Sequence, residues 1–240
     1  MSMSILACIV AGLQAAPCAV ETQELSVNNG KQDLIVARPT ASSPYKKAWQ
    51  GLYAGGSLGY GFGSSTQSYD RNANHGLATI EPSGLSGSVT AGYNYRLYDR
   101  IVVGVEADFG VMDLSTGPHT IYDGHSWKAR FGPLWGSARA RLGYLWNDDW
   151  LLFGTAGLAF MHTDSRSIGN TAPETAYDKS FRTGFVIGAG AEYAINKNIS
   201  AKVEYLYMDF GKYSGLSANN EDFYFKDHIN MIRLGVNYHF

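Results

Sequence analysis

The segment from residue 231 to residue 240 is the part of this chain that most constrains its fold. Its apolar residues alternate strictly with polar residues and glycine: Ile232, Leu234, Val236, Tyr238 and Phe240 against Arg233, Gly235, Asn237 and His239. A period of two residues with one wholly apolar face is the pattern of a β-strand. Terminal segments of soluble domains usually fray. A closing strand of a soluble β fold is therefore the less favoured interpretation, and a strand facing lipid is the alternative.

Seven earlier segments show the same alternation, so the sequence predicts eight strands. Their ranges are 49–61, 84–97, 101–112, 134–146, 150–161, 183–194, 199–210 and 230–240. A tilted strand needs ~9–11 residues to cross a bilayer, and each range is long enough. Short connections rich in Asn and Asp, at 98–100, 147–149 and 195–198, alternate with long ones at 62–83, 113–133, 162–182 and 211–229. This alternation is typical of short periplasmic turns and long outer loops.

The faces of the predicted strands favour a membrane barrel over a soluble one. In seven of the eight segments one face carries no charge, whereas the fifth, 150–161, is apolar on both faces and its orientation stays open. A soluble lipocalin-type barrel would place the apolar face inside and would need a well-solvated exterior. A membrane barrel places that face in lipid, where a charge near the midplane costs ~2–4 kcal/mol. We therefore predict an all-β, eight-stranded antiparallel up-and-down transmembrane β-barrel over residues 49–240.

Aromatic residues gather at the predicted periplasmic ends of the strands, as expected for an interfacial girdle. They are Trp49, Tyr98, Trp146, Trp150, Tyr193 and Phe240.

Charged residues of nearly balanced sign occupy the opposite, inward face. They are Arg96, Glu106, Asp108, Arg139, Arg141, Glu192, Lys202, Glu204 and Arg233. Counting from the turns places Glu106 level with Arg141, Asp108 level with Arg139, and Glu204 level with Arg233. Because desolvated charges need partners, and because eight strands leave an interior that side chains fill, we expect an ion-pair network that plugs the lumen. A lumen lined by water is the alternative.

Composition and the N-terminal region limit the remaining possibilities. The net charge of −2 argues against a nucleic-acid partner, and a mean hydropathy of −0.17 argues against a helical membrane protein. Residues 1–19 are expected to form a signal peptide, although one without a basic start. Both cysteines, Cys8 and Cys18, fall inside it, and a lipidation box at Cys8 is the less favoured alternative. Residues 20–48 are expected to be a periplasmic linker.

Several segments resemble a known protein family, in its order along the chain. They include 49–56 (WQGLYAGG), 91–95 (AGYNY), 103–109 (VGVEADF), 138–144 (ARARLGY), 188–194 (GAGAEYA), 204–211 (EYLYMDFG) and 233–240 (RLGVNYHF). Together they are similar to the small eight-stranded outer-membrane proteins of alphaproteobacteria, which include surface antigens, porin-like proteins and haemin-binding proteins. The resemblance implies a bacterial outer-membrane location, contact with the lipid bilayer and lipopolysaccharide, and recognition by the barrel-assembly machinery through Tyr238 and Phe240.

Function in such a barrel is expected on the outer loops, because the matched motifs belong to strands. The favoured expectation is a surface protein with a structural role in the envelope, weakly porin-like, without a cofactor and without enzymatic activity. The alternative is haemin binding by His119, Tyr122 and His125, since His and Tyr can ligate haem iron. A host ligand at the loops is a further possible partner. A lipid-modifying enzyme using His162, Asp164 and Ser165 is a minor alternative. No spacing indicates a metal site.

Overall fold

The computed structural model describes residues 49–68, 78–116, 119–121, 125–168, 175–216 and 222–240. The expected signal peptide, 1–19, and linker, 20–48, lie outside them. The described residues form ten strands: β1 (Gly51–Ser68), β2 (Ala78–Ile80), β3 (Ser83–Tyr98), β4 (Ile101–Ser115), β5 (His119–Ile121), β6 (His125–Leu145), β7 (Trp150–Ile168), β8 (Thr175–Ala194), β9 (Ile199–Leu216) and β10 (Asp222–His239). Within these residues no helix is long and apolar enough to cross a membrane.

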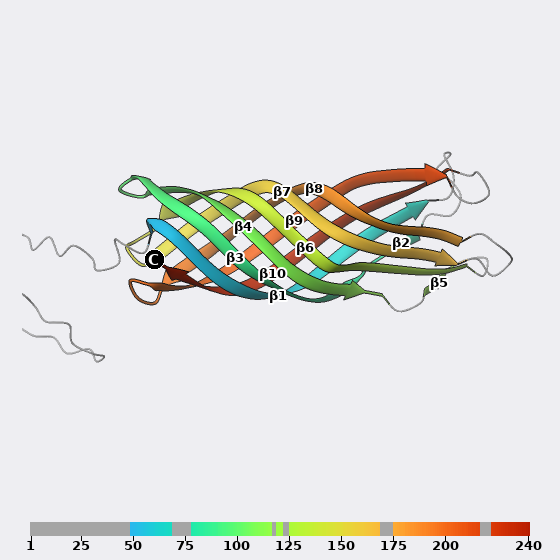
Figure 1. Ribbon diagram of the computed structural model, residues 1–240, viewed down its shortest axis with the longest axis horizontal. Helices are drawn as coiled ribbons and strands as arrows, with labels where there is room; N and C mark the ends of the chain where they lie inside the picture. Colours follow the sequence, from blue (N-terminus) through green and yellow to red (C-terminus); the bar gives the residue numbers. More distant parts are fainter. Residues whose placement is uncertain (1–48, 69–77, 117–118, 122–124, 169–174, 217–221) are drawn as a thin grey trace, which may run out of the picture. The chain divides into compact units, whose positions relative to one another are not determined.

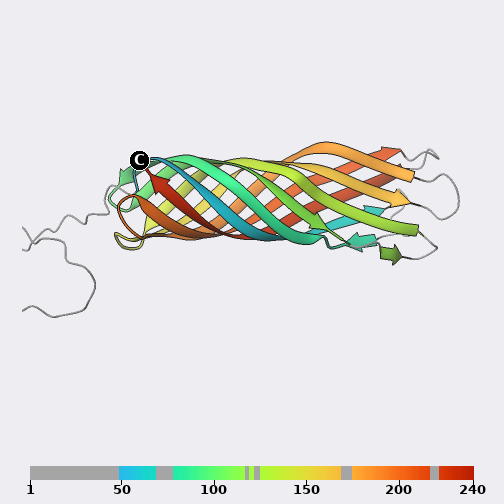
Figure 2. The same ribbon diagram turned by 60° about the horizontal axis from the view of Figure 1, so that its bottom comes forward.

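Eight of these strands close into an antiparallel barrel in the order β10-β9-β8-β7-β6-β4-β3-β1 (Figure 1). The seam is the pairing of β1 with β10, which runs from Tyr53 opposite His239 to Ser68 opposite Tyr224. Figure 2 shows these two strands, blue and dark red, side by side. The three-residue strands β2 and β5 pair with β1 and β6 at the end away from the C-terminus. The predicted all-β, eight-stranded barrel is confirmed.

The strands are longer than the sequence predicts, and they take in much of the expected outer loops. Strand β7 continues to Ile168, where the prediction ended at 161, and β6 begins at His125, where the prediction began at 134. The short strands β2 and β5 also lie in expected loops. Beyond the bilayer both faces of a strand meet water, so hydrogen-bonded pairing continues there without the apolar alternation that marks a membrane strand.

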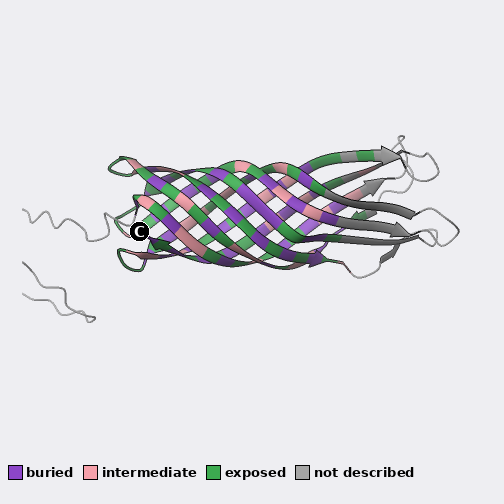
Figure 3. Cartoon of the chain, viewed as in Figure 1, coloured by how far each residue is buried: buried purple, intermediate pink, exposed green. Residues whose placement is uncertain are grey.

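Buried and exposed residues alternate along the strands (Figure 3). Because alternate side chains of a barrel strand point inward, the buried ones line the lumen. They form three layers along the barrel. The periplasmic layer is apolar and consists of Trp49, Val102, Leu145, Leu151 and Ala194. The outer layer is also apolar and includes Met112, Leu114, Phe131, Trp135, Met161, Val186, Met208 and Ile229. Between them lies a polar layer that holds eight buried charges, and a further buried pair, Arg182 and Asp227, lies outside this layer.

Aromatic side chains form two belts on the outside of the barrel, one at each edge of its apolar band, and the outer belt lies on β1, β8 and β9. The periplasmic belt includes Tyr95, Tyr98, Trp146, Trp150, Tyr193, Tyr238 and Phe240. The outer belt includes Tyr60, Phe62, Phe181, Phe185 and Tyr205. The predicted girdle is therefore present, but the expectation for Trp49 was wrong. Its ring is fully buried inside the barrel end, where its Nε1–H donates to the Asp148 carbonyl at 2.9 Å. This residue precedes β1, so strand alternation does not determine where its side chain points.

Candidate functional site

The centre of the lumen is organised around the guanidinium group of Arg139 on β6. One of its nitrogens, Nη1, donates to Oε1 of Glu204 on β9 at 2.6 Å. The other, Nη2, donates to Oδ2 of Asp108 on β4 at 2.6 Å and also bonds Glu106. One arginine thus joins acids from strands on different sides of the lumen. Because Nη1 and Nη2 both bond acids, the guanidinium group is held in place across the barrel.

Two further cations complete this central network. The Nε–H of Arg233 on β10 donates to Oε2 of Glu204 at 2.9 Å, and its Nη1 donates to Oδ1 of Asp108 at 2.9 Å. The ammonium of Lys202 on β9 donates to Oε2 of Glu106 at 3.0 Å. Each acid therefore contacts at least two cations, which is the arrangement that buried charges require.

A second group lies toward the periplasmic end, around Glu192 on β8. Its carboxylate accepts from Arg141 and from Ser200, and Asn237 Nδ2 donates to Oε1 at 2.8 Å. The Arg141 guanidinium stacks 3.9 Å from the centre of the Phe153 ring.

Tyr53 links the two groups. Its hydroxyl donates to Oε2 of Glu106 at 2.7 Å and accepts from Arg141 Nη1 at 3.3 Å. Gly92 leaves room for the Tyr53 ring, because a Cβ added at this glycine would lie only 2.4 Å from the Tyr53 hydroxyl oxygen.

The charges of the polar layer balance and are shielded from solvent. Four acids face four cations: Glu106, Asp108, Glu192 and Glu204 against Arg139, Arg141, Lys202 and Arg233. Their side chains are at most 1% exposed. Charges at this level of burial are stable only when paired. The structure therefore contains an ion-pair network at this level of the lumen, and the plugging of the lumen stays a prediction.

Eight of the nine predicted lumen charges belong to this network, and Arg96 does not. Arg96 is half-buried at the end of β3 and donates to the Asp99 carbonyl in the adjacent turn. This prediction was wrong because Arg96 is the register partner of Val102 in the periplasmic apolar layer, so it lies beyond the polar layer.

Two of the three predicted level pairs were also wrong. Glu204 is opposite Arg233 as expected, but Glu106 is opposite Arg139, and Asp108 is opposite Ser137. Neighbouring strands of a barrel are staggered by its shear. Counting residues from the turns ignores this stagger, so the predicted partners of Glu106 and Asp108 are two residues away from the observed ones.

The sequence analysis missed the polar side chains that complete the network and a second ion pair above it. Tyr53, Ser200 and Asn237 are inward residues of predicted strands, so their alternation could have identified them. The second pair joins Arg182 on β8 to Asp227 on β10, beyond the outer apolar layer. Both residues fall in ranges predicted as loops, where no apolar alternation indicates a strand.

The residues predicted for haemin binding and for catalysis are not brought together by any described contact. His119 lies in β5 and pairs with Trp127, and His125 begins β6 and pairs with Ile121. Their side chains and the whole of Tyr122 lie outside the described part of the structure. His162 is half-buried on β7, whereas the side chains of Asp164 and Ser165 are likewise not described. Within the described residues no cluster could hold a metal ion. Haemin binding and catalysis stay predictions.

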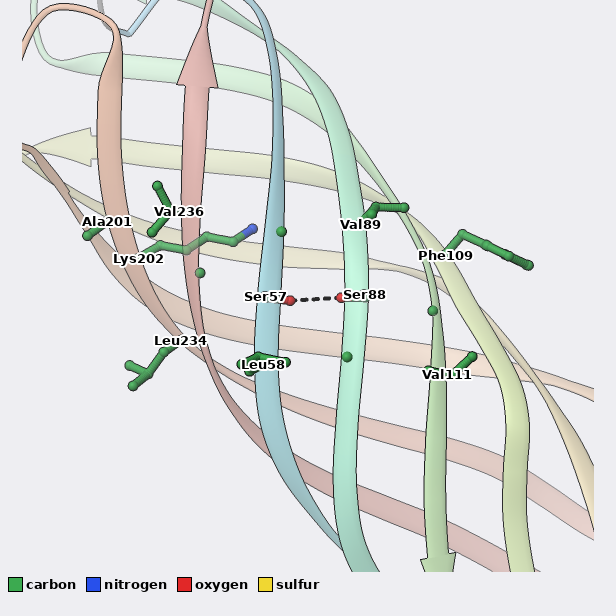
Figure 4. Close-up of a pocket in the computed structure, with 14 residues that line it drawn as sticks. Ser57, Leu58, Ser88, Val89, Phe109, Val111, Ala201, Lys202, Leu234 and Val236 are labelled. Atoms are coloured by element: carbon green, nitrogen blue, oxygen red, sulfur yellow. Dashed lines mark hydrogen bonds between the residues drawn. The ribbon is translucent and has the colours of Figure 1, made fainter.

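A shallow groove of about 980 Å³ crosses the outside of β9, β10, β1, β3 and β4 (Figure 4). Its lining combines glycines such as Gly56 with Leu58, Val89 and Phe109. These residues belong to the apolar band, so the groove suits the acyl chains of the bilayer. Its polar lining residues are engaged elsewhere: Ser57 and Ser88 hydrogen-bond each other at 2.7 Å, and Lys202 donates to Glu106 in the lumen.

Comparisons with known proteins agree with this geometry. A family model described as an outer membrane protein beta-barrel domain matches residues 34–240. The 31 kDa outer-membrane immunogenic protein of Brucella melitensis biotype 1 is 35% identical over 221 residues, covering 87% of this chain and 92% of the relative. The 22 kDa outer membrane protein of Rhizobium leguminosarum bv. viciae is 33% identical over 177 residues, covering 70% of this chain and 68% of the relative.

A solved structure supports the fold alone. The outer membrane protein OprG from Pseudomonas aeruginosa superposes with a TM-score of 0.51 at 14% identity, covering 81% of this chain and 99% of that one. The curated relatives are named as outer-membrane proteins and not as enzymes. The chain belongs to the outer-membrane β-barrel family and is a surface protein of the bacterial outer membrane.

Proposed function

We propose that this barrel is a closed anchor, which contributes to the envelope and holds surface segments at the outer face without conducting solutes. The observation that supports this proposal is the layering of the lumen. A balanced, solvent-shielded ion network lies between two apolar layers. An ion crossing the barrel would have to pass both apolar layers and displace charges that already hold one another. The layered interior therefore favours a structural role over a porin-like one.

The role in display rests on the outer strand extensions. Beyond the outer aromatic belt β6, β7 and β8 remain paired with one another, for example from Thr163 opposite Ser180 to Ile168 opposite Thr175, and β9 remains paired with β10. Hydrogen-bonded strands are a firm support for connecting segments. The surface segments would therefore be carried on rigid stalks above the lipid.

Planar-bilayer recording tests the proposal. The barrel is refolded in detergent, its β content is checked by circular dichroism, and it is inserted at a known protein-to-lipid ratio. The closed anchor predicts a current no greater than that of the protein-free bilayer over a range of voltages. Steady single-channel openings of the wild-type barrel would contradict the proposal. An accepted porin recorded in the same bilayers shows that insertion and detection work.

A further inference from the structure

Two lysines face each other on the outside of the barrel, above its apolar band. Lys212 on β9 is the register partner of Lys226 on β10, and both side chains are exposed. The next residue on β10, Asp227, is buried, so alternation directs Lys226 away from the lumen. The Lys212 ammonium lies 4.0 Å from the centre of the Tyr224 ring, the diagonal neighbour on the same face.

Their height above the membrane follows from β10 itself. From Phe240 to Ile232 the outward residues are apolar, and Asn230, which accepts from the Tyr205 hydroxyl at 2.6 Å, is the first polar one. An apolar band of ~25 Å takes up about ten residues of a strand tilted by ~40°, which also ends the band near residue 230. Lys226 is four residues farther along, roughly 10 Å above the band. This is the level of lipid headgroups.

No described side chain neutralises the charges of these two lysines. Like charges directly opposite on neighbouring strands are destabilising, and among the described side chains neither ammonium has a carboxylate partner. The nearby Asp209 accepts from the Gly211 backbone N–H at 2.7 Å and from the Tyr207 hydroxyl at 3.4 Å. An anion from outside the chain would relieve the repulsion between the two lysines.

On another side of the barrel, an exposed cation is paired with an acid of the protein. On β4 and β6, also on the outer face, the Arg130 Nε–H donates to Asp113 Oδ1 at 2.8 Å. That exposed cation has an acid partner, whereas no acid among the described side chains pairs with Lys212 or Lys226.

We propose that Lys212 and Lys226 bind a phosphate on the headgroup of outer-leaflet lipopolysaccharide. Two ammonium groups provide up to six donors for one phosphate, and each lysine near an anionic membrane surface contributes ~1 kcal/mol. Tyr224 holds Lys212 by a cation–π contact and so reduces the entropy lost when the anion binds. The inference depends on the membrane position of the barrel and not on whether the lumen is closed.

The test is a binding titration with the folded, detergent-solubilised barrel. The probe is purified lipid A carrying its phosphates, compared with the same lipid after enzymatic dephosphorylation. The variants are Lys212→Gln, Lys226→Gln, the double variant, and Lys197→Gln as the matched control. Lys197 is an equally exposed lysine in the turn between β8 and β9 at the periplasmic end. Circular dichroism and urea midpoints confirm that each barrel is folded.

The proposal predicts that the double variant binds phosphorylated lipid A at least about tenfold more weakly than the wild type. Lys197→Gln should bind like the wild type. Dephosphorylated lipid A should bind the wild type as weakly as the phosphorylated lipid binds the double variant. Equal Kd values for wild type and double variant would overturn the proposal. Displacement of the lipid by an equal concentration of inorganic phosphate would also overturn it, since the site would then select a free anion and not a lipid headgroup.

Discussion

At the scale of single residues, Arg139 is the side chain on which the lumen network depends most. Its guanidinium bonds Glu106, Asp108 and Glu204, and none of these side chains is exposed. Arg139→Ala leaves buried acids short of a cation, so we expect a loss of ~3–5 kcal/mol in the free energy of unfolding. The loss is measured from urea unfolding in lipid vesicles. Arg100→Ala, at an exposed turn, is the control and should stay within ~0.5 kcal/mol.

A double-mutant cycle separates lost pairing from lost packing at this arginine. Arg139→Gln and Glu106→Gln each leave a buried charge without its full set of partners, whereas the double variant removes one charge of each sign. We therefore expect the double variant to lose less stability than the sum of the two single variants. Additive losses would mean that Arg139 and Glu106 are not coupled and that Arg139 acts through its other partners or its volume.

Glycine packing gives a second prediction for single residues. A Cβ at Gly92 would lie 2.4 Å from the Tyr53 hydroxyl, whereas at Gly56, on the lipid face, the nearest atom is the Ser88 carbonyl oxygen at 3.8 Å. Gly92→Ala should lower the free energy of unfolding by ~1–3 kcal/mol through overpacking. Gly56→Ala should leave it nearly unchanged. Equal urea midpoints for the two variants would show that Tyr53 moves without cost.

At the scale of strands, the seam between β1 and β10 has aromatic side chains at its periplasmic edge. The Phe240 backbone N–H donates to the Leu52 carbonyl at 3.0 Å, and the Phe240 ring packs edge-on against Tyr238 with centroids 5.2 Å apart. We expect Phe240→Ala to lower the amount of folded barrel in the outer membrane several-fold. The reason is that the variant would lose the recognition by the assembly machinery that we predict for Tyr238 and Phe240, and it would also lose an interfacial anchor.

Tyr98 is the matched control for that prediction, because Tyr98 and Phe240 are both 69% exposed in the periplasmic belt. Tyr98→Ala removes a similar anchor from the turn between β3 and β4. The measurement is the yield of folded protein in purified outer membranes. If both variants reduced the yield equally, Phe240 would be an anchor like any other belt residue, with no separate part in assembly.

The strands also show what periodicity could and could not predict. The sequence predicted eight membrane strands and their lipid faces because a bilayer imposes a strict apolar alternation. It could not orient 150–161. In the structure Leu151 and Phe153 face the lumen, where one belongs to the periplasmic apolar layer and the other supports Arg141. The sequence also could not predict the register between strands, because the closed barrel sets its shear. It could not predict the outer extensions of the strands either, because a strand in water needs no apolar face.

At the scale of the whole barrel, the proposed closed anchor has three lumen layers that act in series. Any path for ions must cross the layer around Leu151, the charged layer, and the layer around Phe131 and Trp135. Removing the central cation alone leaves both apolar layers closed. We therefore expect Arg139→Ala to lower stability without producing current, which separates the two roles of the network.

Opening the barrel should require changes in more than one layer. A variant with Leu151→Gly opens only the periplasmic layer, and one with Phe131→Ala and Trp135→Ala opens only the outer layer. We expect neither to conduct in planar bilayers, whereas their combination leaves a charged, water-accessible constriction that passes small ions intermittently. Circular dichroism must first show that each barrel is folded, because core truncations of this size cost ~3–5 kcal/mol each. Current through either partial variant would show that a single layer forms the barrier. If several layers block ions one after another, ions pass only when every layer has been opened.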